Sequence, residues 1–204
     1  MNPRGTFERV YDAIRHLLEA ARFAPGDHLE PSHLAEQFNS SITPVRDALQ
    51  RLVGERLIEA SPGEGFRMPV FTEVGLRQLY EWNGQLLQLA LKGTGDVPGE
   101  EERAAEPLEK DPLLLADRAS RLFAAVAGRS GNGELLAAVQ ALNIRLSLVR
   151  YREADLIKNV AGELLAIEQF HVLNDVAGLR RALYSYHRRR QGIADRLVIA
   201  VKPS

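Results

Sequence analysis

The sequence predicts a mainly α protein in which an N-terminal winged helix-turn-helix is followed by an all-α helical bundle. Three observations support this fold class. Over the first 70 residues, short segments with helical apolar spacing alternate with turn signals, a Pro- and Gly-containing hairpin signal closes that part, and helical spacing then returns. We therefore expect two domains, residues 1–71 and residues 72–204.

The first two helices are short and are bounded by turn residues. A helix is expected over residues 7–21, because apolar side chains recur there at helical spacing and "PGD" follows at 25–27. In "EPSHLAEQF", Pro31 can open a second helix because the first helical position needs no N–H donor. Leu34, Ala35 and Phe38 then lie on one face, which must pack on neighbouring elements because two turns alone are not stable.

The third helix, expected from Thr43 to Glu55, has one apolar and one polar face. Thr43 is a suitable N-cap and Pro44 suits the first helical position. The polar face carries Arg46 and Gln50. The apolar stripe that should face the core consists of Val45, Ala48, Leu49 and Leu52.

A hairpin signal follows the third helix. The runs "LIEA" and "GFRMPV" have strand character, and "SPGEG" between them suits a tight loop. Three helices and a hairpin in this order form a winged helix-turn-helix, in which the third helix can enter the major groove of DNA and the hairpin reaches the backbone or minor groove.

The start of the third helix carries the residue types that contact DNA. Ser41 and Thr43 supply hydroxyls beside free helix N–H groups, an arrangement that favours a phosphate. Arg46 and Gln50 can read base edges, since Arg pairs with guanine and Gln with adenine. The alternative is that the two hydroxyls only cap the helix and Arg46 is a solvated surface charge.

The charge of this region is unusual for a DNA-binding domain. Residues 1–70 hold eight arginines, no lysine and ten carboxylates, a formal net charge of −2, and the whole chain carries −1. Binding driven by counterion release should therefore be modest and strongly dependent on salt. We expect a dimer that presents two recognition helices to a pseudo-palindromic site in double-stranded DNA.

Residues 9–68 resemble the winged helix-turn-helix of GntR-family bacterial transcription regulators. The matching motifs are "PGDHL", "LAEQF", "TPVRDALQRL" and the glycine wing. Two positions where the family often has arginine hold Ser32 and Ile42, and we keep Ser32 among the candidate DNA-facing residues. The DNA contacts that the resemblance implies are Ser41, Thr43, Arg46 and Gly63.

The remaining chain predicts a helical bundle of about five helices. Its first helix, residues 73–92, has apolar spacing that includes Trp82 and Leu89, and a Gly-, Pro- and acid-rich loop follows at 93–112. "SGN" and "NDVAGLRRAL" further along resemble the effector domain of the FadR-type (FCD-like) subgroup. The resemblance implies a homodimer and a small-molecule effector, commonly a carboxylate bound through a metal.

The residues at the effector positions do not follow the family pattern. Ala119 stands at the metal-ligating Asp position, and Asn83 stands where an arginine commonly meets the carboxylate. We therefore expect no metal, no cofactor and no transfer of the family's organic-acid function. We expect apolar and aromatic side chains to fill the cavity, which either still admits an apolar or aromatic ligand or is closed. The three His positions hold Phe123, Leu164 and Tyr186.

Two alternatives concern charged and histidine residues near that cavity. A metal site could be rebuilt from Asp117, His171 and His187, but His187 is one residue out of place, which should turn its imidazole away from the bundle axis. We keep His187 as a candidate effector residue. "HRRRQ" at 187–191 is interpreted as a solvated helix face, with a contact to DNA backbone or the other domain as the alternative.

Several function classes are not expected. The chain has no cysteine, no apolar run long enough to span a membrane, and none of the common catalytic motifs. We expect a cytoplasmic, sequence-specific transcription regulator, homodimeric and modulated by a small molecule, rather than an enzyme. One rival is a dimeric partner-binding protein whose degenerate winged helix reads no defined operator, and another is a metal-dependent enzyme built on His171 and His187.

Overall fold

The computed structural model describes residues 3–61, 63, 65–93 and 111–202. The chain divides into two compact units, one formed by Met1–Phe71 with Lys202–Ser204 and the other by Thr72–Val201. We call them the N-terminal and C-terminal domains and describe each by itself. Most of the loop expected at 93–112 lies outside the described residues.

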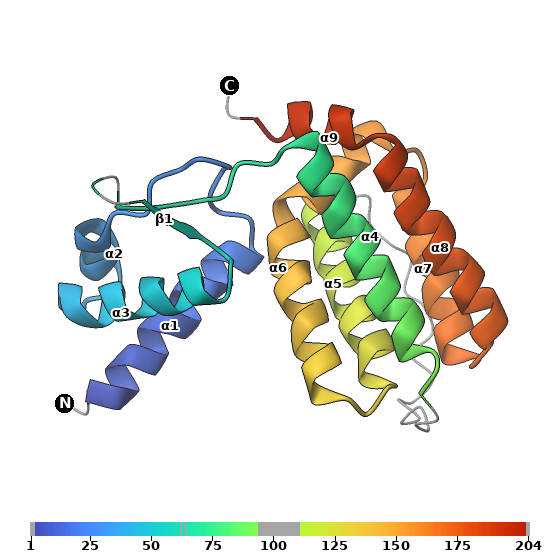
Figure 1. The fold of residues 1–204 in the computed structure, drawn as a ribbon, viewed down its shortest axis with the longest axis horizontal. Helices are drawn as coiled ribbons and strands as arrows, with labels where there is room; N and C mark the ends of the chain where they lie inside the picture. The colour runs from blue at the N-terminus through green and yellow to red at the C-terminus, as the bar shows by residue number, and fades with distance from the viewer. Residues whose placement is uncertain (1–2, 62, 64, 94–110, 203–204) are drawn as a thin grey trace. The chain divides into compact units, whose positions relative to one another are not determined.

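The N-terminal domain has the predicted order of three helices and a hairpin (Figure 1). The strands pair antiparallel with Ala60 opposite Phe66. The elements are α1 (Pro3–Glu19), α2 (Pro31–Gln37), α3 (Ile42–Gly54), β1 (Glu59–Ser61) and β2 (Gly65–Arg67).

The core of this domain lies between α1 and α3. Val10 and Ile14 of α1 are fully buried, and so is the whole predicted stripe of α3. Leu34 and Ala35 of α2 are also buried, which confirms two residues of the expected face, whereas Phe38, the C-cap of this helix, is only partly buried. Since the apolar face of α3 is used in packing, its opposite face is left exposed to solvent.

The predicted N-cap of α3 is two residues late. Helix α3 begins at Ile42, and its N-cap is Ser41 with an extended backbone, so Thr43 is not the cap. Pro44 occupies the third helical position and not the first. This position tolerates proline because the first-turn N–H groups have no acceptor within the helix. Pro44 therefore predicts the start of the helix to within one turn and not to a single residue.

The C-terminal domain contains six helices in its described residues, one more than predicted. The single helix expected at the C-terminal end is divided at Ile193, whose backbone leaves the helical region. The helices are α4 (Glu73–Ala90), α5 (Pro112–Gly128), α6 (Gly133–Leu156), α7 (Val160–Val172), α8 (Val176–Gly192) and α9 (Ala194–Ala200).

The bundle is built from the helix pair α5 and α6 and from a group of three helices, α4, α7 and α8. Helix α5 packs along α6, and α8 packs along both α4 and α7 (Figure 1). Polar side chains cap four helix starts by accepting backbone N–H bonds, as Asn132 does from Glu134 and Leu135. The other capping residues are Thr72, Asp111 and Asp175.

The inward face of α4 agrees with the predicted one at Leu76, Leu79, Leu86 and Ala90 and differs from it at Trp82 and Leu89. Trp82 and Leu89 are each 50% exposed, whereas Tyr80 and Asn83 are completely buried. The apolar spacing of the sequence is satisfied by more than one helix face, and the packing on α6 and α8 selects the face that carries the tyrosine and the asparagine.

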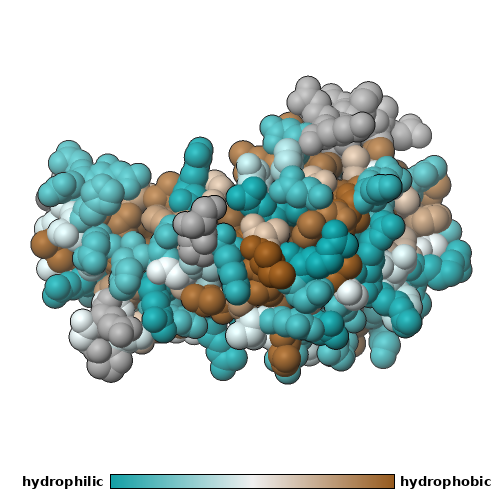
Figure 2. All heavy atoms as spheres, turned by 90° about the horizontal axis from the view of Figure 1, so that it is seen from above, coloured by the Kyte–Doolittle hydropathy of each residue, from teal (hydrophilic) through white to brown (hydrophobic). Residues whose placement is uncertain are grey.

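No helix among the described residues has both the length and the apolar character needed to cross a membrane. In the space-filling view of Figure 2, hydrophilic residues cover most of the visible face, and hydrophobic residues form small groups between them.

Candidate functional site

The exposed face of α3 gathers most of the residues predicted to contact DNA. Ser41, Thr43, Arg46 and Gln50 are all exposed along this helix, and Ser32 is exposed on α2. The side chain of the N-cap Ser41 makes no capping bond. The first-turn N–H groups of α3 and these hydroxyls are therefore open to an anionic partner.

Two arginines of α3 have different environments. Arg51 contacts Glu55 at 3.1 Å and Glu8 at 3.6 Å, and its guanidinium lies 4.1 Å from the centre of the Tyr11 ring. Arg46 has no carboxylate within ion-pair distance in the described part of the chain. Arg51 thus braces α3 against α1, whereas Arg46 is available to a ligand.

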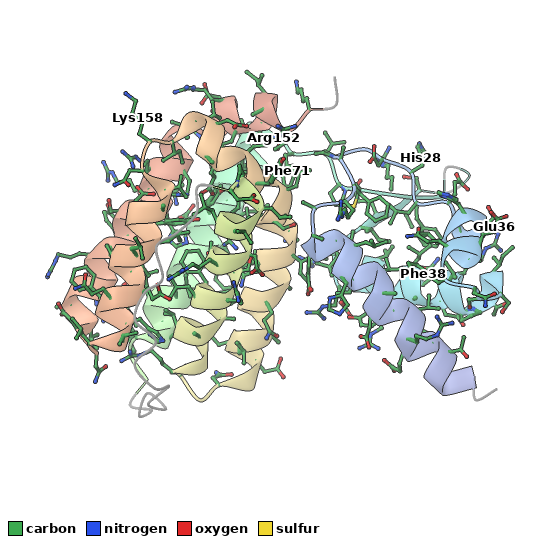
Figure 3. The ribbon with its side chains drawn as sticks, turned by 180° about the vertical axis from the view of Figure 1, so that it is seen from behind. His28, Glu36, Phe38, Phe71, Arg152 and Lys158 are labelled. Carbon is green, nitrogen blue, oxygen red and sulfur yellow. The ribbon has the colours of Figure 1, made fainter. Side chains whose placement is uncertain are left out.

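The wing places Gly63 at its turn. Gly63 is exposed and has a φ of +80°, a left-handed conformation that favours glycine. The hairpin is joined to the preceding loop by a bridge between His28 and Arg67, and His28 lies at the surface in Figure 3. The two residues beside Gly63 in the turn, 62 and 64, are outside the described residues.

Four of the five predicted effector residues are brought together inside the bundle. The rings of Phe123 and Tyr186 meet edge to face with centres 5.1 Å apart, and the His187 ring lies 5.1 Å from Tyr186 and 5.7 Å from Phe123. The imidazole also contacts the side-chain amide of Asn83 at 2.8 Å. Leu164 is completely buried in α7, as the expectation of apolar filling requires.

The expectation that His187 points away from the bundle is wrong. Its side chain is 3% exposed, with Nδ1 2.7 Å from the carbonyl of Leu183 and Nε2 against Asn83. Helix α8 packs on α4 as well as α7, so a residue turned away from one helix still faces another. Because Nδ1 must donate to a carbonyl, neutral Nε2 accepts, and we assign the Asn83 amide with its nitrogen toward the ring.

Burial controls the protonation of this cluster. Desolvation, together with the positive charges of Arg150 and Arg190, lowers the pKa of His187 to about 3. Desolvation also raises the pKa of the Tyr186 hydroxyl to about 12. Both groups are therefore neutral at physiological pH.

A buried charged network lies beside the aromatic cluster, and sequence reasoning did not find it. Arg190 and Glu153 are 0% and 1% exposed and pair at 2.7 Å. The same carboxylate accepts hydrogen bonds from Tyr80 at 2.6 Å and Tyr186 at 3.3 Å. Burial alone would lower the pKa of Arg190, but the charge and hydrogen bond of Glu153, together with the electrostatic interactions of Tyr186 and Glu163, outweigh burial and raise that pKa.

The interpretation of "HRRRQ" as a solvated face is therefore wrong for two of its residues. His187 and Arg190 are buried, while Arg188 and Arg189 are exposed. Arg189 contacts Glu163 at 2.6 Å and Arg188 donates to the Tyr184 hydroxyl at 2.9 Å. This helix turn carries a neutral histidine and an arginine on its inward face and two arginines on its outward face, because α8 packs on α4 and α7 and its opposite face is exposed.

The residues at the family's metal positions do not fit a divalent ion. Ala119, Phe123 and Leu164 have no donor atom, and the Tyr186 hydroxyl is bonded to Glu153. The shifted alternative is not assembled either, since Asp117 lies on an exposed face paired with Arg121 at 2.7 Å. Within the residues that the structure describes, no three His, Cys, Asp or Glu side chains form a metal-binding group.

Comparison with known proteins identifies relatives of the N-terminal half. The family "Bacterial regulatory proteins, gntR family" matches residues 6–68. The "HTH-type transcriptional regulator McbR" of Escherichia coli is 37% identical over 107 residues, 50% of this chain and 47% of that protein. The "Nta operon transcriptional regulator" of Aminobacter aminovorans is 29% identical over 141 residues, 63% of this chain and 66% of its own.

The matched part of the chain spans about half the length of the first curated relatives. Solved structures resemble the whole chain in fold. "E. coli McbR/YncC" covers 94% of this chain and 97% of its own with a TM-score of 0.71 at 24% identity, and a GntR regulator from a Rhodococcus species covers 92% and 96% with a TM-score of 0.77 at 17% identity. The winged helix-turn-helix at residues 6–68 thus matches the GntR family of bacterial regulatory proteins, and the chain as a whole shares the fold of these solved structures.

Proposed function

We propose that the protein is a sequence-specific, DNA-binding transcription regulator. The observation that carries this proposal is the exposed face of α3, where Arg46 and Gln50 have no side-chain partner among the described residues and the N-cap side chain makes no capping bond. Both side chains suit base edges in the major groove. The curated relatives named above are transcriptional regulators and not enzymes, which agrees with a chain in which we found no catalytic motif.

The experiment that tests this proposal is selection of bound duplexes from a random DNA pool at two salt concentrations. The full chain should enrich a pseudo-palindromic motif, and Arg46→Ala should lose one conserved base pair per half-site and bind about 10-fold to 100-fold more weakly, as expected for a bidentate arginine. Arg56→Ala, at an exposed position beyond α3, removes the same charge and should keep the motif. Uniform, salt-sensitive binding by all three proteins would refute sequence reading.

The rival function is a partner-binding protein with a degenerate winged helix. The net charge of −2 over residues 1–70 and the absence of arginine at Ser32 and Ile42 favour it. It predicts that no motif is enriched at either salt concentration. The same selection therefore separates the two functions.

We further propose a homodimer whose contact lies on α4 and α8. Trp82, Leu89 and Tyr184 are 50%, 50% and 58% exposed and line one surface groove. Large exposed apolar side chains grouped in this way mark an interaction surface, and Trp and Tyr are enriched where binding energy is concentrated. A dimer also compensates for the unfavourable net charge of each DNA-binding domain, because its two recognition helices contact two half-sites of the DNA.

Sedimentation equilibrium should show a particle of twice the 22.7 kDa chain mass at micromolar concentration. Trp82→Ser should weaken dimerisation at least about 10-fold, because truncation of a central aromatic residue costs about 2 kcal/mol or more. Leu173→Ser removes a side chain that is 68% exposed on another part of the domain and should leave the dimer intact. A monomer at all concentrations would refute the dimer.

A regulator of this kind acts on the bacterial chromosome, so we place it in the cytoplasm. A small molecule bound in the C-terminal domain would alter the half-site geometry if it favours one arrangement of the dimer. The cluster of Asn83, Phe123, Tyr186 and His187 supports an effector site in the C-terminal domain, because it combines aromatic surface with a few polar groups.

A further inference from the structure

Arg150 of α6 is a buried cation without a counter-ion among the described residues. Its side chain is 2% exposed. Nη1 donates to Oδ1 of Asn143 at 2.9 Å and to Oγ of Ser120 at 3.2 Å. Nε and Nη2 are buried and have no hydrogen-bond partner in the described part of the chain.

The neighbouring carboxylates are already used. Glu153, one turn further along α6, is bound to Arg190, Tyr80 and Tyr186. Glu163 is shared between Arg190 at 2.8 Å and Arg189 at 2.6 Å. Two buried arginines thus face one buried carboxylate and one partly exposed carboxylate that also serves a third arginine.

This imbalance points to a missing anion. Arginine cannot lose its proton in a protein, so burial cannot neutralise Arg150. An isolated buried charge is strongly unfavourable unless it is paired and hydrogen-bonded. The amide and hydroxyl oxygens on Nη1 supply hydrogen bonds but no negative charge.

The geometry of the free nitrogens selects the kind of anion. Nε and Nη2 form one planar edge of the guanidinium, with two parallel N–H groups whose spacing matches the oxygens of a carboxylate. The Phe123 ring lies 4.9 Å from the Arg150 Cζ, and Phe123 also packs on Tyr186 and His187. A planar charged group beside aromatic rings suits a small organic acid with an apolar body.

We propose that the Nε and Nη2 edge of Arg150 binds the carboxylate of a small monocarboxylic acid, without a metal. This residue is neither the position at which family members commonly meet a carboxylate, Asn83 here, nor one of their metal-ligand positions. Binding itself is independent of DNA. Only its regulatory meaning rests on the proposed function, and a test of binding in the absence of DNA keeps the two separate.

The test is thermal unfolding of the full chain with acetate or benzoate, each compared with its neutral amide, at ionic strength held constant with potassium fluoride. The fluorescence of Trp82, the single tryptophan, reports on the C-terminal domain. Either acid at about 100 times its dissociation constant should raise the midpoint by about 5–10 °C, whereas acetamide and benzamide should not.

Arg150→Met is the variant and Arg152→Met the matched control, because Arg152 lies two residues along α6 with its side chain 45% exposed, at the surface in Figure 3. Arg150→Met should abolish the midpoint shift and, without any acid, should unfold at the same or a higher temperature than the natural chain, since it removes an unpaired buried charge. Arg152→Met should retain the shift. Equal shifts in the natural chain and Arg150→Met, or no shift with either acid, would overturn the proposal. A shift of the same size when potassium chloride replaces the acid would also overturn it.

Discussion

Replacement of Glu153 by alanine should remove about 3–5 kcal/mol from the free energy of unfolding of the C-terminal domain, the cost of breaking a buried ion pair on one side. The change leaves the Arg190 guanidinium, which is 0% exposed, with the partly exposed Glu163 as its single carboxylate partner within the described part of the chain. It also removes the acceptor of the buried Tyr80 hydroxyl. Glu153 pairs with one arginine and accepts hydrogen bonds from two tyrosine hydroxyls, so a single substitution removes the acceptor of three buried groups.

Urea unfolding followed by Trp82 fluorescence and by circular dichroism measures this loss. Asp117→Ala is the control, because Asp117 forms an exposed pair with Arg121 and its removal should cost less than about 0.5 kcal/mol. A double variant, Glu153→Leu with Arg190→Met, should recover most of the stability, since replacing both charges by apolar groups is often neutral. A loss under about 1 kcal/mol for Glu153→Ala would show that the network contributes little.

The N-terminal domain was predictable because its signals are local. Pro31 and the apolar stripe of α3 each fix an element from a few neighbouring residues, and the order of elements then allows one arrangement. The N-cap of α3 is Ser41 and not the predicted Thr43, because serine and threonine both serve as caps. Which exposed arginine forms ion pairs could not be predicted, since the pairing of Arg51 depends on α1.

The interior of the C-terminal domain was predicted only in part. The aromatic positions Phe123 and Tyr186 are buried as expected, but Arg150, Glu153 and Arg190 resemble surface charges in sequence. One signal could have revealed them. Along α6, the buried Leu146 and Val149 are followed at spacings of four residues by Arg150 and Glu153, so charged residues continue an inward stripe. The partner of Glu153 lies 37 residues away, and no local pattern indicates it.

Acidification should destabilise the C-terminal domain through His187. Burial, with the nearby Arg150 and Arg190 charges, lowers its pKa from 6.5 in the unfolded chain to about 3 in the folded chain. Between these values the unfolded chain binds a proton that the folded chain does not, so this contribution is complete above pH 6.5 and is lost as the pH falls toward 3. At pH 5 the loss relative to pH 7 should be about 2 kcal/mol.

Urea unfolding at pH 7 and pH 5, with Trp82 as reporter, separates this effect from the protonation of carboxylates, which the natural chain and a variant share. His187→Gln keeps a neutral hydrogen-bonding group beside Asn83 and should reduce the loss at pH 5 by about 2 kcal/mol relative to the natural chain. His33→Gln, at an exposed position of the N-terminal domain, should leave it unchanged. If His187→Gln keeps the full pH dependence, the imidazole must accept a proton inside the fold, and the two buried arginines would then need more negative charge around them than Glu153 and Glu163 provide.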